Sequence, residues 1–413
     1  MKVHKNIRFT ELSLIVTVDF GKQFNYGFMR TIRDKEMKPF KFSNNAEGFD
    51  DLWTKVQAFK STYRLEEVYF GFEPTGSYGH PLVRFMQDRG CHLMQINPKH
   101  TKRVKELQDN SPNKTDKKDP RVIADILLLG KAMGIVLPVG EQADLRYLAH
   151  TREGILEERN RLINQLEGLL AAYFPEFLQI MPALTSKSSL YVLRTYTLPK
   201  NIAQTLNKDF IDDLRKVSRY QLTVERIQEF YGSACRTVGV RHGSTGMQTS
   251  VRLLVNRLDR LNEDLQTLEA EIKEKVENQP VGQLLLSIKG IQHITVGYLI
   301  GELADLDKYA DQSALLKMAG LSLYEISSGA LRGKKRITKR GRSLVRKILY
   351  LAVLNMLKEG GIYHQQYQDR CQAGKAKMAS IVVFMKKLLV MMYSMTKKDQ
   401  VFDPNYNDIR QAA

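Results

Sequence analysis

The segment Leu12-Ser-Leu-Ile-Val-Thr-Val-Asp19 decides the fold, because an almost unbroken apolar run ends abruptly in a carboxylate. A run of this length, rich in β-branched residues, is typical of a buried strand. A second apolar run, Val68-Tyr-Phe-Gly-Phe72, ends in the same way at Glu73. If the two strands are neighbours, both acids lie together at one edge of a sheet.

The residues up to about 140 alternate strand and helix signals around these two runs. Further strands are expected at Tyr26–Arg30, Lys38–Phe42 and Cys91–Ile96, and helices at Glu47–Tyr63, from Ser77, from Pro98 and from Asp119-Pro120. The resulting order β-β-β-α-β-α-β-α is typical of a mixed sheet covered by helices. It matches RNase H and RuvC-like domains, so we expect an α/β domain of this kind in residues 1–140.

The middle of the chain, residues 141–280, is predicted to be a long helical spacer. Apolar residues there alternate at three and four positions, which is the pattern of a coiled coil. They are Val251, Leu254, Leu258, Leu261, Leu265, Leu268 and Ile272. This seam could pack within one chain or between chains, and its regularity favours packing between chains.

Residues 281–413 are predicted to form a compact helical domain, which makes the whole chain α/β plus α. The helices Leu284–Ile288 and Thr295–Leu303, joined by Lys289-Gly-Ile291, resemble the hairpin by which helix pairs approach a phosphate backbone. Two longer helices are expected at Leu344–Leu357 and about Ala376–Met395.

The composition points to a polyanionic partner. The 63 Lys and Arg residues outnumber the 45 Asp and Glu residues, which gives a net charge of +18, and nucleic acid is the first candidate for such a surplus. No apolar run approaches 18 residues and the first residues lack the apolar stretch of a signal peptide, so we expect no membrane span and a cytoplasmic location. Cys91, Cys235 and Cys371 have neither zinc nor disulfide spacing and are expected to be buried, inert thiols.

Four acids stand where a metal-dependent nuclease needs them. Asp19 and Glu73 end strands, and Glu73 opens the sharp turn Glu73-Pro-Thr-Gly-Ser-Tyr78. Asp116 and Asp119 are three residues apart at an expected helix start. Clustered carboxylates repel one another, so a fold that gathers four of them usually holds divalent cations, here Mg²⁺ or Mn²⁺. Such ions serve displacement at a phosphodiester.

A basic run in the last third of the chain follows a serine turn, Ser327-Ser-Gly329. A serine hydroxyl beside several cations could attack a phosphodiester, with Tyr324, Tyr363 and Tyr367 as alternative hydroxyl nucleophiles. The run has nine basic residues and no acid: Arg332, Lys334, Lys335, Arg336, Lys339, Arg340, Arg342, Arg346 and Lys347. The cations expected to bind nucleic acid are the first seven of these, together with Lys102, Arg103, Lys105 and Lys114.

Several motifs together resemble the bacterial insertion-sequence transposases of the IS-one-ten family. They are Val18-Asp-Phe-Gly-Lys22, Glu73-Pro-Thr-Gly-Ser-Tyr78, Lys114-Thr-Asp-Lys-Lys-Asp119, Ala319-Gly-Leu321, Ser328-Gly329 and Ile337-Thr-Lys-Arg-Gly-Arg-Ser-Leu-Val-Arg346. The resemblance covers residues 12–135 and 281–398. It implies a RuvC-like DEDD domain, a coiled coil and a C-terminal transposase domain with a serine.

By position in these motifs, the four carboxylates of the family fall on Asp19, Glu73, Asp116 and Asp119, and its serine falls on Ser328, with Ser327 one residue away. The family also implies donor and target DNA, a bridge RNA as guide, and a serine that completes the DEDD site of another subunit. We therefore expect a homo-oligomer, a dimer that assembles to a tetramer, acting at the bacterial nucleoid.

Two other interpretations fit the same residues. One is a RuvC-like junction resolvase that uses water as the nucleophile, with Ser328 merely structural. The other is a non-catalytic RNA-binding protein that oligomerises through Val251–Ile272. A labelled DNA substrate separates the three, because a covalent adduct indicates a recombinase, free ends a hydrolase, and intact DNA a binding protein.

Overall fold

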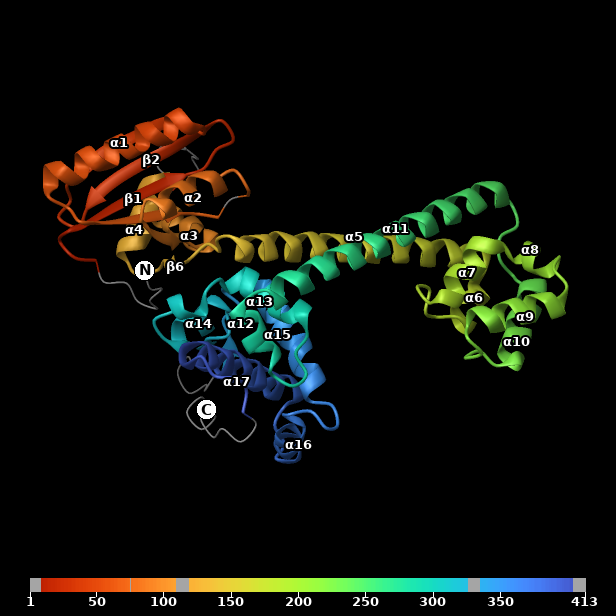
Figure 1. Ribbon diagram of the computed structural model, residues 1–413. Helices are drawn as coiled ribbons and strands as arrows, with labels where there is room; N and C mark the ends of the chain where they lie inside the picture. The colour runs from red at the N-terminus through yellow and green to blue at the C-terminus, as the bar shows by residue number, and fades with distance from the viewer. Residues whose placement is uncertain (1–8, 75, 109–118, 326–334, 404–413) are drawn as a thin grey trace. The chain divides into compact units, whose positions relative to one another are not determined.

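The computed structural model describes residues 9–74, 76–108, 119–325 and 335–403 (Figure 1). The chain divides into two compact units. The first combines Met1–Arg146 with Lys275–Ala413, and the second is Tyr147–Glu274. The two borders lie close to the expected ones at 140 and 280, but the first and third predicted domains belong to one unit.

A six-stranded sheet forms the N-terminal part of the first unit. Its strands are β1 (Ser13–Asp19), β2 (Phe24–Thr31), β3 (Glu36–Ser43), β4 (Glu67–Phe72), β5 (His92–Gln95) and β6 (Met133–Gly134). They lie in the order β3-β2-β1-β4-β5-β6. β1, β4 and β5 run parallel to one another, while β2, β3 and β6 are antiparallel to their neighbours. This confirms the mixed sheet and fits an RNase H-like domain; β6 was not predicted.

Four helices cover this sheet: α1 (Ala46–Tyr63), α2 (His80–Asp88), α3 (Pro98–Gln108) and α4 (Asp119–Leu128). Helix α4 packs directly on the central strands β1, β2 and β4, and its buried residues share a core with Ile15 of β1. Gly71 of β4 makes this close approach possible, since a Cβ atom there would lie only 2.1 Å from Cδ1 of Leu127. The helix that begins at Asp119 is therefore seated against the strand that ends at Asp19.

The C-terminal part of the first unit is helical, as predicted. Its elements are α12 (Pro280–Leu286), α13 (His293–Leu303), the short 3-10 helix η1 (Leu306–Lys308), α14 (Gln312–Met318), β7 (Leu323–Tyr324), β8 (Arg336–Ile337), α15 (Ser343–Met356), α16 (His364–Gln372) and α17 (Lys377–Lys398). Gly290, with a φ of +93°, makes the turn between α12 and α13. A helical hairpin was expected at this position.

Helix α17 is the core helix of this part. It contacts α12, α14, α15 and α16, and Phe384, Leu388 and Leu389 along it are completely buried. In the part of the chain that the structure describes, α17 alone is long and apolar enough to cross a membrane by length and composition. Its packing against these four helices and against η1 accounts for that apolar character.

In the second unit, two long antiparallel helices lead to a lobe of short ones (Figure 1). The long helices are α5 (Glu141–Tyr173) and α11 (Ser244–Glu277), and the short ones are α6 (Pro175–Ile180), α7 (Lys187–Thr195), α8 (Pro199–Ala203), α9 (Asn207–Val217) and α10 (Val224–Cys235). Side chains join the long pair at successive levels. Arg152 pairs with Glu269 at 2.6 Å, and Arg159 Nε donates to Asn262 Oδ1 at 3.0 Å.

The apolar seam of α11 is buried inside the chain itself. Val251 and Leu258 have no exposed surface, and they share a core with Leu162, Leu166 and Leu170 of α5. Our expectation that this seam packs between chains is therefore wrong for these residues. A heptad pattern specifies an apolar face but does not say which helix covers it.

Candidate active site

The two strand-end acids lie side by side at one edge of the sheet. Asp19 is the last residue of β1, and Glu73 directly follows the last residue of β4. These strands are parallel neighbours, with Val18 opposite Phe72, so the next position on each strand carries a carboxylate. Both acids are half-buried. The predicted meeting of Asp19 and Glu73 at one edge is confirmed.

The third acid comes to the same edge through helix α4. Asp119 is the first residue of that helix and is 9% exposed. The Thr17 hydroxyl of β1 donates a hydrogen bond of 2.6 Å to the carbonyl of Pro120, which fixes the helix start against the end of the strand. Three of the four predicted acids are thus carried by adjoining elements.

The donor chemistry of this edge suits a hard divalent cation, because such ions prefer carboxylate oxygens. Within residues 9–74, 76–108, 119–325 and 335–403, no three His, Cys, Asp or Glu side chains form a ready-made metal cluster. Asp116, the fourth predicted acid, lies outside the described residues. Asp19, Glu73 and Asp119 are the described residues that could contribute ligands to such an ion.

The predicted serine turn lies outside the described residues, as do Lys114, Arg332 and Lys334. Its neighbours are described. Strands β7 and β8 pair antiparallel, with Tyr324 opposite Arg336, so the two ends of the segment that carries Ser327 and Ser328 lie together. Tyr363, one alternative nucleophile, is 2% exposed, and burial raises the pKa of its hydroxyl. It belongs to the core.

The described cations of the basic run fall into two groups. Lys335, Arg336, Lys339 and Arg340 are exposed and form what we call the basic segment. Lys102 and Arg103 on α3 are also exposed; the side chain of Lys105 lies outside the described residues. These cations are available to bind phosphates.

Arg342 belongs to the second group, because its side chain is only 12% exposed and lies 3.3 Å from Glu302. Glu302 is 3% exposed and is also 4.0 Å from Arg146. Arg346 donates to the carbonyls of Ala319 and Arg342, and burial lowers its pKa. Arg342 thus differs from the exposed cations, since a buried carboxylate holds its half-buried side chain, and its role in binding nucleic acid stays a prediction.

A histidine that the sequence did not single out lies among the exposed cations. His100 of α3 has its Nε2 3.4 Å from Nη1 of Arg340. Burial, followed by the charges of Arg340, Arg103 and Lys131, lowers the pKa of His100. The basic segment and α3 therefore contribute to one positive region. The two residues in contact there, His100 and Arg340, are 240 positions apart in the sequence.

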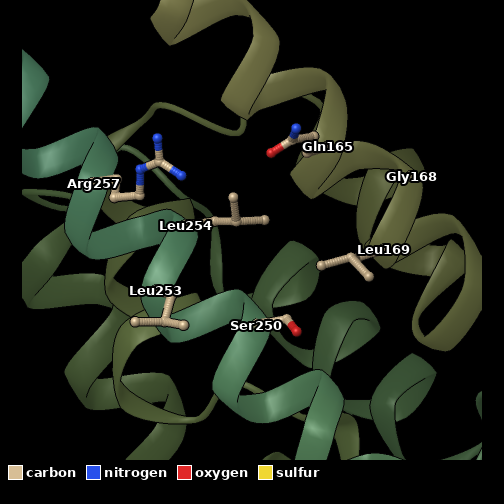
Figure 2. A pocket seen from close by; sticks show the side chains of 7 residues that line it. All are labelled: Gln165, Gly168, Leu169, Ser250, Leu253, Leu254 and Arg257. Carbon is tan, nitrogen blue, oxygen red and sulfur yellow. The ribbon is translucent and has the colours of Figure 1, made fainter.

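The second unit has a surface groove between α5 and α11, and its chemistry differs from that of the acid edge (Figure 2). The residues that line it are Gln165, Gly168, Leu169, Ser250, Leu253, Leu254 and Arg257. None of these lining residues is an acid, and six of the seven are uncharged and come from both helices.

The six-stranded mixed sheet with its covering helices fits an RNase H-like transposase domain, and comparisons with known proteins identify the family. Residues 16–175 match the family model for DEDD transposases of IS110, described as "Transposase". Residues 282–368 match the model described as "Transposase IS116/IS110/IS902 family". The chain belongs to the IS110 family of insertion-element transposases.

Two relatives support this assignment. The chain is 19% identical over 396 residues to "Insertion element IS110 uncharacterized 43.6 kDa protein" of Streptomyces coelicolor, covering 95% of this chain and 96% of that protein. It is 25% identical over 190 residues to "Putative transposase y4uE" of Sinorhizobium fredii, covering 45% of this chain and 52% of that protein.

Proposed function

We propose that this transposase is an RNA-guided DNA recombinase that moves an insertion sequence by using edge carboxylates and a serine. The observation that carries the proposal is the convergence of Asp19, Glu73 and Asp119 on adjoining elements of an RNase H-like sheet. Donor and target DNA are its substrates, and a bridge RNA encoded by its own element selects them. We place it in the bacterial cytoplasm at the nucleoid.

Asp19, Glu73, Asp119 and, by its position in the motif, Asp116 would hold Mg²⁺ or Mn²⁺. A divalent ion bound there supplies Lewis-acid chemistry that polarises a phosphodiester. The exposed cations of the basic segment and of α3 bind phosphates on either side of the cut.

Ser328 is the proposed nucleophile. Its Oγ forms a bond to phosphorus while the bond from phosphorus to a deoxyribose oxygen breaks, and the leaving oxygen takes up a proton. The product is a phosphoserine ester, which conserves the energy of the phosphodiester, so rejoining needs no external energy source. No His or Asp stands beside Ser328 in the sequence as a base, so its activation depends on the neighbouring cations and the assembled site.

The decisive experiment looks for a covalent protein–DNA adduct with labelled DNA, guide RNA and Mg²⁺. We expect an adduct with the wild-type protein and none with Ser328→Ala or Asp19→Ala, although both variants should still bind RNA and DNA. An adduct that persists in Ser328→Ala and vanishes in Ser327→Ala moves the nucleophile by one residue. Free DNA ends without any adduct would instead indicate a junction resolvase that uses water.

A further inference from the structure

Two asparagines connect the loops that follow Asp19 and Glu73. Asn25 lies on β2, is completely buried, and comes directly before Tyr26, the residue opposite Asp19 in the sheet. Asn44 follows the last residue of β3. Neither residue was singled out by the sequence, because asparagine near a turn is common.

Their amides make a continuous chain of hydrogen bonds. The backbone N–H of Gly21 donates to Asn25 Oδ1 at 3.1 Å, and Asn25 Nδ2 donates to Asn44 Oδ1 at 3.1 Å. Asn44 Nδ2 then donates to two carbonyls, that of Gly21 at 3.2 Å and that of Tyr78 at 3.2 Å. Gly21 lies two residues after Asp19, and Tyr78 lies five residues after Glu73.

The pattern of donors and acceptors requires an amide at both positions. A backbone N–H only donates and a backbone carbonyl only accepts. Asn25 must therefore turn its oxygen toward Gly21, which directs its NH₂ toward Asn44, and Asn44 must turn its NH₂ toward the two carbonyls. Aspartate at position 44 would place a carboxylate against two carbonyl oxygens and could donate to neither.

A second contact joins the same two loops. The ring of Phe20, next to Asp19, lies 5.7 Å from the ring of Phe72, next to Glu73. Gly79, directly after Tyr78, lies under Phe20, and a Cβ atom there would be 2.3 Å from that ring. The apolar contact limits the distance between the two loops, whereas the directional hydrogen bonds of Asn44 fix how one loop is aligned with the other.

We infer that Asn25 and Asn44 are positioning residues that hold Asp19 and Glu73 at the spacing needed to bind a metal ion together. The inference rests on the proposed function, because it takes these two acids as ligands. Neither asparagine touches a reacting group in this role. They act on the backbone of the two loops, in the way that partners of metal ligands generally set ligand orientation.

The test compares Asn44→Asp and Asn44→Ala with a neighbouring control, Asn45→Asp. Asn45 caps α1 by accepting a hydrogen bond of 3.0 Å from Gly48 N, and a carboxylate can keep that bond at a helix N-terminus. The control therefore adds the same charge one residue away without breaking the network. The Asn44→Ala variant removes the network without adding charge.

Three measurements use the full-length protein: amide hydrogen exchange of residues 19–23 and 73–80, Mn²⁺ binding followed by electron paramagnetic resonance without DNA, and cleavage across a Mn²⁺ series. Both Asn44 variants should exchange faster in both loops, bind Mn²⁺ about 10- to 100-fold more weakly, and cleave half-maximally at a correspondingly higher Mn²⁺ concentration. The Asn45→Asp control should resemble the wild type in all three measurements.

Wild-type exchange and Mn²⁺ affinity in both Asn44 variants would overturn the inference. So would a lower melting temperature with unchanged Mn²⁺ affinity of the folded protein, because that result describes an ordinary stabilising contact. The proposed function has its own test, since Asp19→Ala and Glu73→Ala should lose Mn²⁺ binding. If these two variants bind Mn²⁺ normally, the metal site is wrong, and the inference about positioning fails with it even if exchange is faster.

Discussion

Cys91 and Cys235 have the same side chain and opposite surroundings. Cys91 is 2% exposed, and burial raises the pKa of its thiol to about 12, although the charges of Lys60 and Arg89 lower it. Cys235 is exposed, and Cys371 is half-buried. The expected burial is thus confirmed for Cys91 and wrong for Cys235, because residue type alone does not set exposure at the end of a helix.

We predict that a thiol-specific disulfide reagent at pH 8 labels Cys235 rapidly and leaves Cys91 unlabelled until the protein unfolds, because the thiolate is the reactive form. Peptide mass spectrometry gives the rate at each cysteine. The raised pKa also means that the folded state disfavours the thiolate, so the contribution of Cys91 to stability falls as the pH rises from about 9 toward 12. Equal labelling rates at Cys91 and Cys235 in the native protein would contradict the structure.

The place of a residue in the fold could be predicted where it follows from the local sequence pattern. It could not be predicted where it depends on a partner far away along the chain. Asp19 and Glu73 each end an apolar run, so their place at a sheet edge follows from local sequence. Arg342 has its partner Glu302 40 positions earlier, and Asn44 reaches the carbonyl of Tyr78, which is 34 positions away. Only the tertiary fold brings such pairs together.

At the scale of elements, the predicted order of strands and helices in the N-terminal domain is confirmed. This order could be predicted because strong apolar runs alternate there with glycine and proline. The two-residue strand β6 carries too little pattern to be recognised. The sequence predicted helix in the middle of the chain but not the lobe of short helices from α6 to α10. Each of these helices is buried by its neighbours and has no long periodic apolar face.

Two charged substitutions in the apolar seam of α11 test whether the seam is covered by the same chain or by another subunit. We predict that Leu258→Asp combined with Leu265→Asp lowers the stability of the protein by several kcal/mol, since both leucines are buried within the chain. Light scattering should show an unchanged mass under conditions where the protein stays folded. As a control, Leu253→Asp on the same helix should have little effect, because Leu253 is 59% exposed. A smaller, still helical particle would mean that the seam also joins subunits.

The basic segment should bind phosphates without reading bases. We predict that Lys335→Ala and Arg336→Ala each flatten the slope of log affinity against log salt concentration by about 0.7 to 0.9, equally for different DNA and RNA sequences. Binding titrations over a salt series measure this slope. Arg342→Ala is the contrasting variant, because it removes the 3.3 Å contact between Arg342 and the buried Glu302 and should mainly lower the melting temperature. A variant that changes target choice at constant slope would contradict the prediction.

For the whole molecule, the question is whether one active site draws on two subunits. If Ser328 of one subunit works with the carboxylates of another, mixing the inactive variants Asp19→Ala and Ser328→Ala should partly restore adduct formation. Mixing Asp19→Ala with Glu73→Ala is the matched control and should restore nothing, because both lesions lie in one set of carboxylates. If the first mixture is also inactive, each chain supplies a complete site.

The discontinuity of the first unit has a consequence for the order in which its contacts form during synthesis. The chain leaves that unit after Arg146 and re-enters it at Lys275, where the Lys275 ammonium group lies 3.0 Å from Asp144. Exit and re-entry are therefore neighbours, which is the geometry that tolerates an inserted domain. Because residues 275–413 are synthesised last, the contacts that complete the first unit can form only after the whole second unit has been synthesised. A short loop in place of residues 147–274 could span the gap between the two segments of the first unit.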